Sequence, residues 1–179
     1  MSVRVTSTPA PCSRVAGVEI REANPDDWPE IWPIFRTVVQ AGETYAFDPD
    51  LTPEQAQDLW MERPPGLTVV AEADGTVLGT AKMGPNRGGR GAHVGTASFM
   101  VSPDARGRGV GRALATYVVD WHRANGFRAI QFNAVVETNT AAVALWESLG
   151  FTVVGTVPEA FEHPTHGYVG LHVMHLPLA

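Results

Sequence analysis

Hydrophobic and polar residues recur along the chain with two periods, one typical of strands and one typical of helices. Residues 18–21 alternate apolar with charged side chains, which predicts a strand on the edge side of a sheet. From residue 28 onwards, apolar residues return every three or four positions, which predicts a helix that starts after Asn24 and ends near Ala41. The apolar side of this helix comprises Trp28, Ile31, Trp32, Phe35, Val38 and Val39.

Two further signals organise the middle of the chain. The sequence Thr52-Pro53-Glu54-Gln55 has the form of a capping box with proline at the first helical position, so we expect a helix that runs to about Glu62. The dipeptide Asp74-Gly75 lies between two apolar runs, and this arrangement predicts a hairpin of strands over residues 67–73 and 76–83.

The second half of the chain alternates between strands and helices. Helices are expected from Val110 to Gly126 and from Asn139 to Gly150, because glycine commonly follows a helix end. The resulting order of elements predicts an α/β (α+β) domain with a mixed, mainly antiparallel central sheet and helices on both faces. Strands are expected at residues 93–101, 128–136, 151–157 and 168–175, the last two joined by a loop that holds Pro158, Glu162, His163, Pro164 and His166.

Composition adds limits on domain number and on partners. The 179 residues are 44% hydrophobic, which is enough for one domain with a core of its own. Residues 1–17 have scattered prolines and no periodicity, so we expect a disordered tail followed by a single domain over residues 18–179. A net charge of −6 argues against nucleic-acid binding, which would need a basic face. Neither a signal peptide nor a membrane-spanning run is visible, so we expect a cytoplasmic protein without membrane contact.

A stretch rich in glycine and arginine joins the strand that ends at Val101 to the next helix. Pro103 ends the strand, because proline has no amide hydrogen for a sheet ladder. The first amide hydrogens of a helix lack partners within the helix, and glycines let the backbone approach a phosphate closely. The stretch therefore predicts a cradle for a phosphate or pyrophosphate; the alternative is a connection that only turns the chain. Its residues are Arg106, Gly107, Arg108, Gly109, Val110, Gly111 and Arg112.

The spacing of these glycines excludes two common phosphate loops and fits a third. No Gly-Lys-Ser/Thr ending follows Gly111, and the dinucleotide fingerprint has a different glycine spacing. The pattern Arg-x-x-Gly-x-Gly, formed by Arg106, Gly109 and Gly111, resembles the acetyl-CoA pyrophosphate loop of the GNAT N-acetyltransferases. A second string, NTAAVALWESLGF, which begins at Asn139, is similar to the second signature of that family. The resemblance covers roughly residues 18–178.

This resemblance implies acetyl-CoA as the co-substrate and direct transfer of its acetyl group to an amine. The strands that flank the glycine-loop helix would be parallel and splay apart, and the cofactor would lie in the crevice between them. Its pyrophosphate would meet the amides of residues 106–112, while Asn139 and Trp146 would contact it from the other side. Its pantetheine arm would pair with the backbone of Phe99, Met100 and Val101, of which the last two offer an amide for the oxyanion.

Acid and base roles are where the chain departs from the family. Many members have a tyrosine acid where this chain has Trp146, whose indole carries no titratable proton in range. Tyr168 is a substitute acid, and Glu43 and Glu137 are candidate bases for the amine proton. Each has a structural alternative: a packing role for the tyrosine, a solvated loop charge for Glu43, and a helix-start acid for Glu137.

Four histidines near the C-terminus raise the question of a metal site. Alternation along a strand places His172 and His175 on opposite faces, so the four do not point to one ion. We therefore expect no metal. The other two are His163 and His166.

The sequence leaves several classes of acceptor substrate open. A partial resemblance to the phosphinothricin acetyltransferase branch favours the primary amine of a small molecule, either amino-acid-like or an antimetabolite. One alternative is a protein or peptide N-acetyltransferase, and another is a non-catalytic acyl-CoA-binding module. Because dimers are common in the family, a homodimer is a further expectation.

Overall fold

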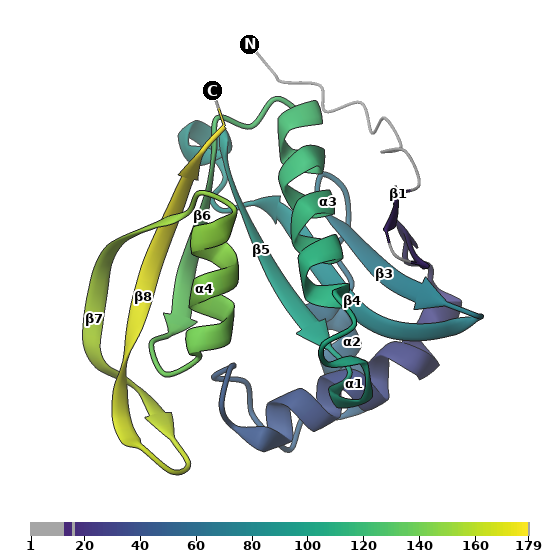
Figure 1. The fold of residues 1–179 in the computed structure, drawn as a ribbon, viewed down its shortest axis with the longest axis horizontal. Coiled ribbons are helices and arrows are strands. Elements are labelled where there is room, and N and C mark those ends of the chain that lie inside the picture. The colour runs from purple at the N-terminus through teal and green to yellow at the C-terminus, as the bar shows by residue number, and fades with distance from the viewer. Residues whose placement is uncertain (1–12, 16, 179) are drawn as a thin grey trace.

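The computed structural model describes residues 13–15 and 17–178 of the chain. Within this part, eight strands form one sheet in the order β1-β2-β3-β4-β5-β6-β8-β7 (Figure 1). All neighbouring strands are antiparallel except β5 and β6, which are parallel, so the predicted mixed, mainly antiparallel sheet is confirmed. The strands are β1 (Ser13–Val15), β2 (Val18–Glu22), β3 (Leu67–Ala73), β4 (Thr76–Pro85), β5 (Val94–Val101), β6 (Ala129–Val136), β7 (Thr152–His163) and β8 (Gly167–Pro177).

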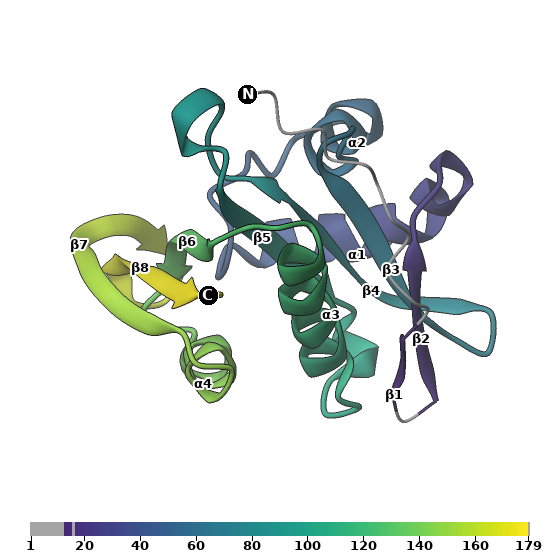
Figure 2. The ribbon, with the colours of Figure 1, turned by 90° about the horizontal axis from the view of Figure 1, so that it is seen from above.

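Helices cover both faces of the sheet (Figure 2). One face packs against α1 and α2, which bury Val70 and Met100 between the layers. The other face packs against α3, which buries Val69, and against α4, whose Trp146 lies on Phe132. The prediction of helices on both faces is therefore confirmed. The helices are α1 (Trp28–Ala41), α2 (Pro53–Trp60), α3 (Val110–Ala124) and α4 (Thr140–Ser148).

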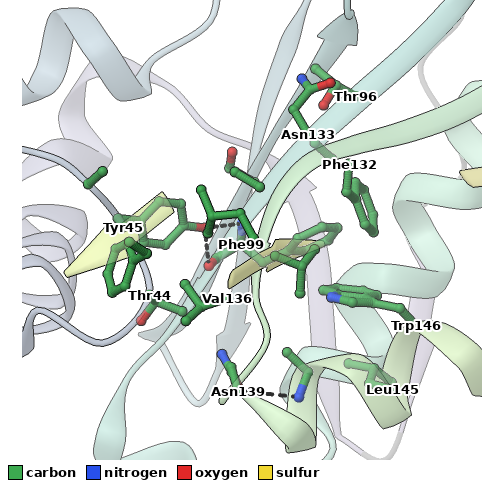
Figure 3. Close-up of a pocket in the computed structure, with 18 of the residues that line it drawn as sticks. Thr44, Tyr45, Thr96, Phe99, Phe132, Asn133, Val136, Asn139, Leu145 and Trp146 are labelled. Carbon is green, nitrogen blue, oxygen red and sulfur yellow. Dashed lines mark hydrogen bonds between the residues drawn. The ribbon is translucent and has the colours of Figure 1, made fainter. Parts of the chain in front are cut away.

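The parallel strands β5 and β6 pair only where they begin. Val94 faces Ala129 and Gly95 faces Ile130, and the described register between the two strands ends there. Beyond this point the strands diverge, as Figure 1 shows, so the predicted splay is confirmed. The resulting opening is seen from close by in Figure 3.

The register of β5 against β4 decides which backbone groups face this opening. The amide of Ser102 donates to the carbonyl of Leu78. Because hydrogen-bonded pairs alternate in an antiparallel ladder, the even-numbered residues of β5 direct their N–H and C=O groups to β4. Met100 is paired with Thr80 in this way. The odd-numbered residues direct their backbone groups to the opening.

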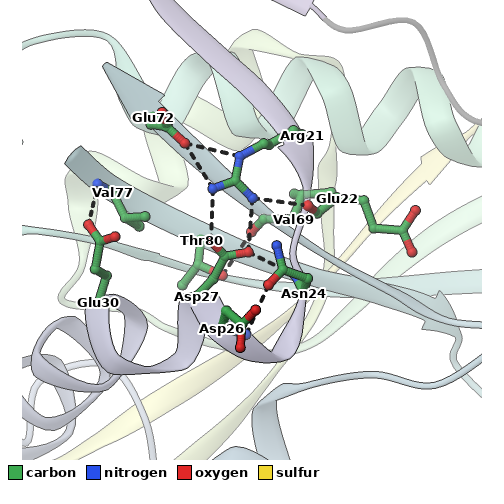
Figure 4. A network of polar contacts seen from close by, with 10 residues as sticks. All are labelled: Arg21, Glu22, Asn24, Asp26, Asp27, Glu30, Val69, Glu72, Val77 and Thr80. Atoms are coloured by element: carbon green, nitrogen blue, oxygen red, sulfur yellow. Dashed lines mark hydrogen bonds and ion pairs between the residues drawn. The ribbon is translucent and has the colours of Figure 1, made fainter. Parts of the chain in front are cut away.

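The start of α1 is fixed to the sheet by an ion-pair network (Figure 4). Arg21 on β2 donates to both carboxylate oxygens of Asp27, at 2.9 and 2.8 Å, and to Glu72 on β3 at 3.0 Å. The Asp27 carboxylate also accepts from the amide of Asn24 at 2.7 Å, and the Asn24 side chain accepts from Asp26. The hydrogen bonds from Arg21 lower the pKa of Asp27. The network therefore supports the capping signal that the sequence shows at Asn24.

Two predicted boundaries near the N-terminal half are wrong. Residues Ser13–Val15 pair with β2, so the disordered tail predicted over residues 1–17 is too long; its residues 1–12 and 16 lie outside the described part. Helix α2 ends at Trp60 rather than Glu62, because Met61 already has an extended backbone.

The loop predicted between the last two strands is also wrong, because the chain forms a long hairpin there. Strand β7 continues to His163 and β8 begins at Gly167. The pairing continues past Pro158 because the register shifts between Val157 and Phe161, and such a bulge accommodates extra residues. Phe161 is buried, so packing favours the strand over the loop that proline indicates locally.

Candidate active site

A cavity occupies the opening between β5 and β6 (Figure 3). At one end it lies between the start of α3, at Gly111, and α4, at Asn139 and Leu145. At the other end it meets the loop between α1 and α2, at Thr44–Phe47. The cavity thus runs from one face of the sheet toward the other through the gap between the strands.

The glycine-rich turn lies at the α3 end of this cavity. Gly107 and Gly109 have φ values of 76° and 77°, in the left-handed region that favours glycine. A Cβ atom on either glycine would meet no atom within 4 Å, so the space around the turn is open. Gly109 directly precedes α3, and the first amides of a helix lack partners within the helix. The turn has the form that a phosphate cradle requires, and Arg106, Arg108 and Arg112 are exposed beside it.

Helix α4 is anchored at both ends. At its start, the Asn139 side-chain oxygen accepts from the amide of Ala142 at 3.2 Å, so Asn139 caps the helix as well as lining the cavity. Near its other end, Ser148 accepts from the Arg112 guanidinium of α3 at 3.1 Å. Arg112 therefore joins the two helices that flank this end of the cavity.

Trp146 forms part of an aromatic wall. Its ring centroid lies 4.7 Å from that of Phe99 and 4.9 Å from that of Phe132, and Phe132 stacks on Phe151 at 4.4 Å. The indole is buried yet lines the cavity (Figure 3). The contact with the cofactor that the sequence resemblance implies for Trp146 stays a prediction.

The backbone contacts predicted on β5 need one correction. Phe99 directs both its N–H and its C=O into the opening, where both meet the Tyr45 hydroxyl. Val101 has the same orientation by register and also lines the cavity. Met100 is wrong as a backbone contact or an oxyanion donor, because its N–H and C=O are directed to β4.

The three predicted acid–base residues lie outside the cavity lining. Glu43 is exposed next to Thr44. Glu137 accepts a short hydrogen bond from the amide of Gly170 and its own amide donates to the Gly170 carbonyl, so it holds β8 in place. Tyr168 is 65% exposed on β8. The geometry supports structural or surface roles for Glu137 and Tyr168 rather than catalytic ones.

A second, more polar recess opens beside the cavity on the α2 side of the sheet. The two share Thr96, Ala97, Ser98 and Asn133 as lining residues. In the recess, Lys82 donates to Glu62 at 3.1 Å and to the carbonyl of Leu59 at 2.7 Å. The amides of Asn86 and Asn133 hydrogen-bond to each other, at 2.7 and 3.2 Å. Two exposed arginines, Arg63 and Arg87, also line the recess.

Sequence reasoning missed the recess and the role of Tyr45. Lys82 faces Ser98 only through the β4–β5 register, and Tyr45 is 54 positions from its partner Phe99. No short motif carries these contacts. The one available signal was an aromatic residue two positions after the candidate base Glu43.

The described residues hold no cluster of three or more metal-binding side chains. His172 hydrogen-bonds Thr156 at 2.7 Å, while His163 packs against His166 with ring centroids 4.6 Å apart. Among the described helices, none has both the length and the apolar character needed to cross a membrane.

Comparison with known proteins shows the family to which the chain belongs. The model of the acetyltransferase (GNAT) family matches residues 19–151, which include the glycine turn, the splayed strands and the whole of α4. The chain belongs to the GNAT family. The resemblance predicted from the two sequence signatures is thereby confirmed.

Three relatives show how far this similarity extends. The chain is 30% identical over 151 residues to the N-acetyltransferase aca1 of Schizosaccharomyces pombe, covering 75% of this chain and 72% of the relative. It is 67% identical to a GCN5-related N-acetyltransferase from Kribbella flavida, with a TM-score of 0.88 and coverage of 90% and 98%. A phosphinothricin acetyltransferase from Sinorhizobium meliloti in complex with acetyl-CoA is 26% identical, with a TM-score of 0.81 and coverage of 91% and 89%.

This GNAT enzyme is an N-acetyltransferase that uses acetyl-CoA as its co-substrate. Two features fit this co-substrate. The open turn at Gly107 and Gly109 lets the backbone approach the phosphates of CoA. The divergence of β5 from β6 leaves backbone groups of β5 free to pair with the pantetheine arm. The homodimer and the cytoplasmic location expected from the sequence stay predictions.

Proposed function

We propose that this GNAT enzyme transfers the acetyl group directly to the primary amine of a small, amino-acid-like molecule. One observation carries the proposal: the cofactor cavity and the polar recess share Thr96, Ala97, Ser98 and Asn133. A thioester in the cavity and an amine in the recess would therefore meet at one wall. Direct transfer requires such a meeting.

The charges of the recess favour an acceptor that carries an anionic group as well as an amine. Arg63 and Arg87 bring two cations to its lining, whereas the Lys82 charge is already paired with Glu62. An arginine binds a carboxylate or a phosphinate through two parallel hydrogen bonds. The name of the Sinorhizobium meliloti neighbour, a phosphinothricin acetyltransferase, supports the same class of acceptor.

The chemistry follows from this placement. The amine loses a proton through water in the recess, toward the Glu62 carboxylate, and its lone pair attacks the thioester carbonyl carbon. The N–H group of Val101 is directed at the opening, where it would stabilise the oxyanion. A C–N bond forms and the C–S bond breaks, and the sulfur keeps the electron pair and takes up a proton from solvent.

The test is thiol release from acetyl-CoA with a panel of amino acids, phosphinothricin, polyamines and short peptides, with acetyl-CoA binding measured alongside. Turnover confined to amino acids and phosphinothricin is the expected result. Turnover on peptides alone would replace the proposal with a protein N-acetyltransferase. Tight binding without turnover on any amine would favour a non-catalytic acyl-CoA-binding module.

A further inference from the structure

Tyr45 lines the cavity at the end opposite the glycine turn. Its hydroxyl accepts from the Phe99 amide at 2.9 Å and donates to the Phe99 carbonyl at 2.7 Å. A neighbouring strand would normally satisfy these two groups, but β6 has already diverged from β5 at this level. The phenol is therefore fixed to one point of the sheet, and Figure 3 shows it pointing into the opening.

The Tyr45 ring is held as firmly as its hydroxyl. It stacks on Phe47 with centroids 5.3 Å apart and planes at 4°, and it meets Trp60 edge-on at 6.1 Å. Trp60 is fully buried, and its indole N–H donates to the Thr80 hydroxyl at 3.0 Å. Behind Phe47 lies Phe35, stacked at 5.7 Å. Moving the Tyr45 ring would disturb this whole aromatic cluster, so this end of the cavity is a stiff wall.

An acyl group longer than acetyl could extend from the middle of the cavity toward the polar recess or toward Tyr45. In the recess, Lys82 and Glu62 would lose hydration against an alkyl chain. In the other direction lies the Tyr45 ring. Burial raises the pKa of Tyr45, so the phenol stays neutral and hydrogen-bonded to Phe99. Neither of these two directions offers an apolar space; the apolar lining from Val135, Val136 and Leu171 lies on the β6 and β8 side of the cavity.

We infer that Tyr45 is a specificity-determining residue that limits the acyl donor to a short chain. The limit comes from the aromatic ring, which occupies the volume that additional methylenes would need. The hydroxyl keeps the ring in place through Phe99. This inference depends on the use of acetyl-CoA and is independent of the proposed amine acceptor.

Calorimetric affinities for acetyl-CoA, propionyl-CoA and butyryl-CoA test the inference without any acceptor. We expect the native enzyme to bind butyryl-CoA at least about tenfold more weakly than acetyl-CoA, since each misplaced methylene is discriminated by roughly tenfold or more. In Tyr45→Ala, the ratio of the acetyl-CoA affinity to the butyryl-CoA affinity should fall to within about threefold. Tyr45→Phe should keep it, because the ring remains stacked on Phe47.

Tyr168→Ala is the matched control, because it removes the same side chain from an exposed position outside the cavity. It should leave the ratio unchanged. If Tyr45→Ala fails to fold, Tyr45→Leu tests the same loss of ring volume. Equal binding of butyryl-CoA and acetyl-CoA by the native enzyme would overturn the inference, and so would an unchanged ratio in a folded Tyr45→Ala or Tyr45→Leu variant.

Discussion

His122 and Gly95 depend on each other at the place where β5 and β6 are still paired. The His122 ring is fully buried on α3, and its Nδ1 donates to the Val118 carbonyl at 2.8 Å. A Cβ atom on Gly95 would lie 2.2 Å from the imidazole, so only glycine leaves room for this ring. Burial lowers the pKa of His122 to about 4. The imidazole is therefore neutral in the folded enzyme at neutral pH.

This depressed pKa predicts a loss of stability in acid. Between about pH 6.5 and 4 the unfolded chain binds a proton at His122 that the folded chain does not, so the free energy of unfolding falls as pH falls. The full effect is roughly 3 kcal/mol, present above pH 6.5 and lost by about pH 4. Urea unfolding across this range should show a weaker pH dependence in His122→Asn, which keeps a donor for Val118. The same slope in both proteins would contradict the prediction.

Local sequence motifs predicted most helices and strands, but they could not predict contacts between residues far apart in the sequence. The capping box at Thr52 and Gln55 forms as expected, because each partner lies within one turn of the other. The hairpin at Asp74-Gly75 also forms, with both residues at positive φ. The full length of β7 was not predicted. Pro158 favours a loop locally, whereas the burial of Phe161 favours a strand.

The same distinction holds for the candidate site. The glycine turn between β5 and α3 was predictable, because positive φ at Gly107 and Gly109 is a property of single residues. Met100 was predicted wrongly, because the direction of its backbone groups depends on the pairing of β5 with β4. The contact of Tyr45 with Phe99 depends on packing of a loop on a strand, which leaves no local pattern.

At the scale of this β5–α3 turn, we predict that Gly109→Glu weakens acetyl-CoA binding about a hundredfold or more. A carboxylate there would occupy the open space before α3 and repel the pyrophosphate. Gly75→Glu is the control: Gly75 has φ 75° and equally open surroundings, but it lies in the β3–β4 hairpin. Calorimetry should show near-native affinity in this control. Native affinity in Gly109→Glu would rule out the cradle.

At the scale of the whole molecule, one sheet parted at its middle brings two sites together. The strands β1 to β5 carry α1 and α2 on one face, and β6, β8 and β7 form a second half that diverges from β5 (Figures 1 and 2). The cofactor cavity lies in the gap, and the polar recess adjoins it on the α2 side. The central claim is that donor and acceptor occupy these two spaces at the same time.

The most direct measurement is the affinity of a conjugate that joins the sulfur of CoA, through an acetyl bridge, to the amine of the best amino-acid acceptor. The conjugate should bind at least about tenfold more tightly than CoA, because the second contact becomes intramolecular. Arg87→Glu should abolish this gain, whereas Arg90→Glu, in the same loop but outside the recess lining, should preserve it. A conjugate that binds no more tightly than CoA would contradict the account.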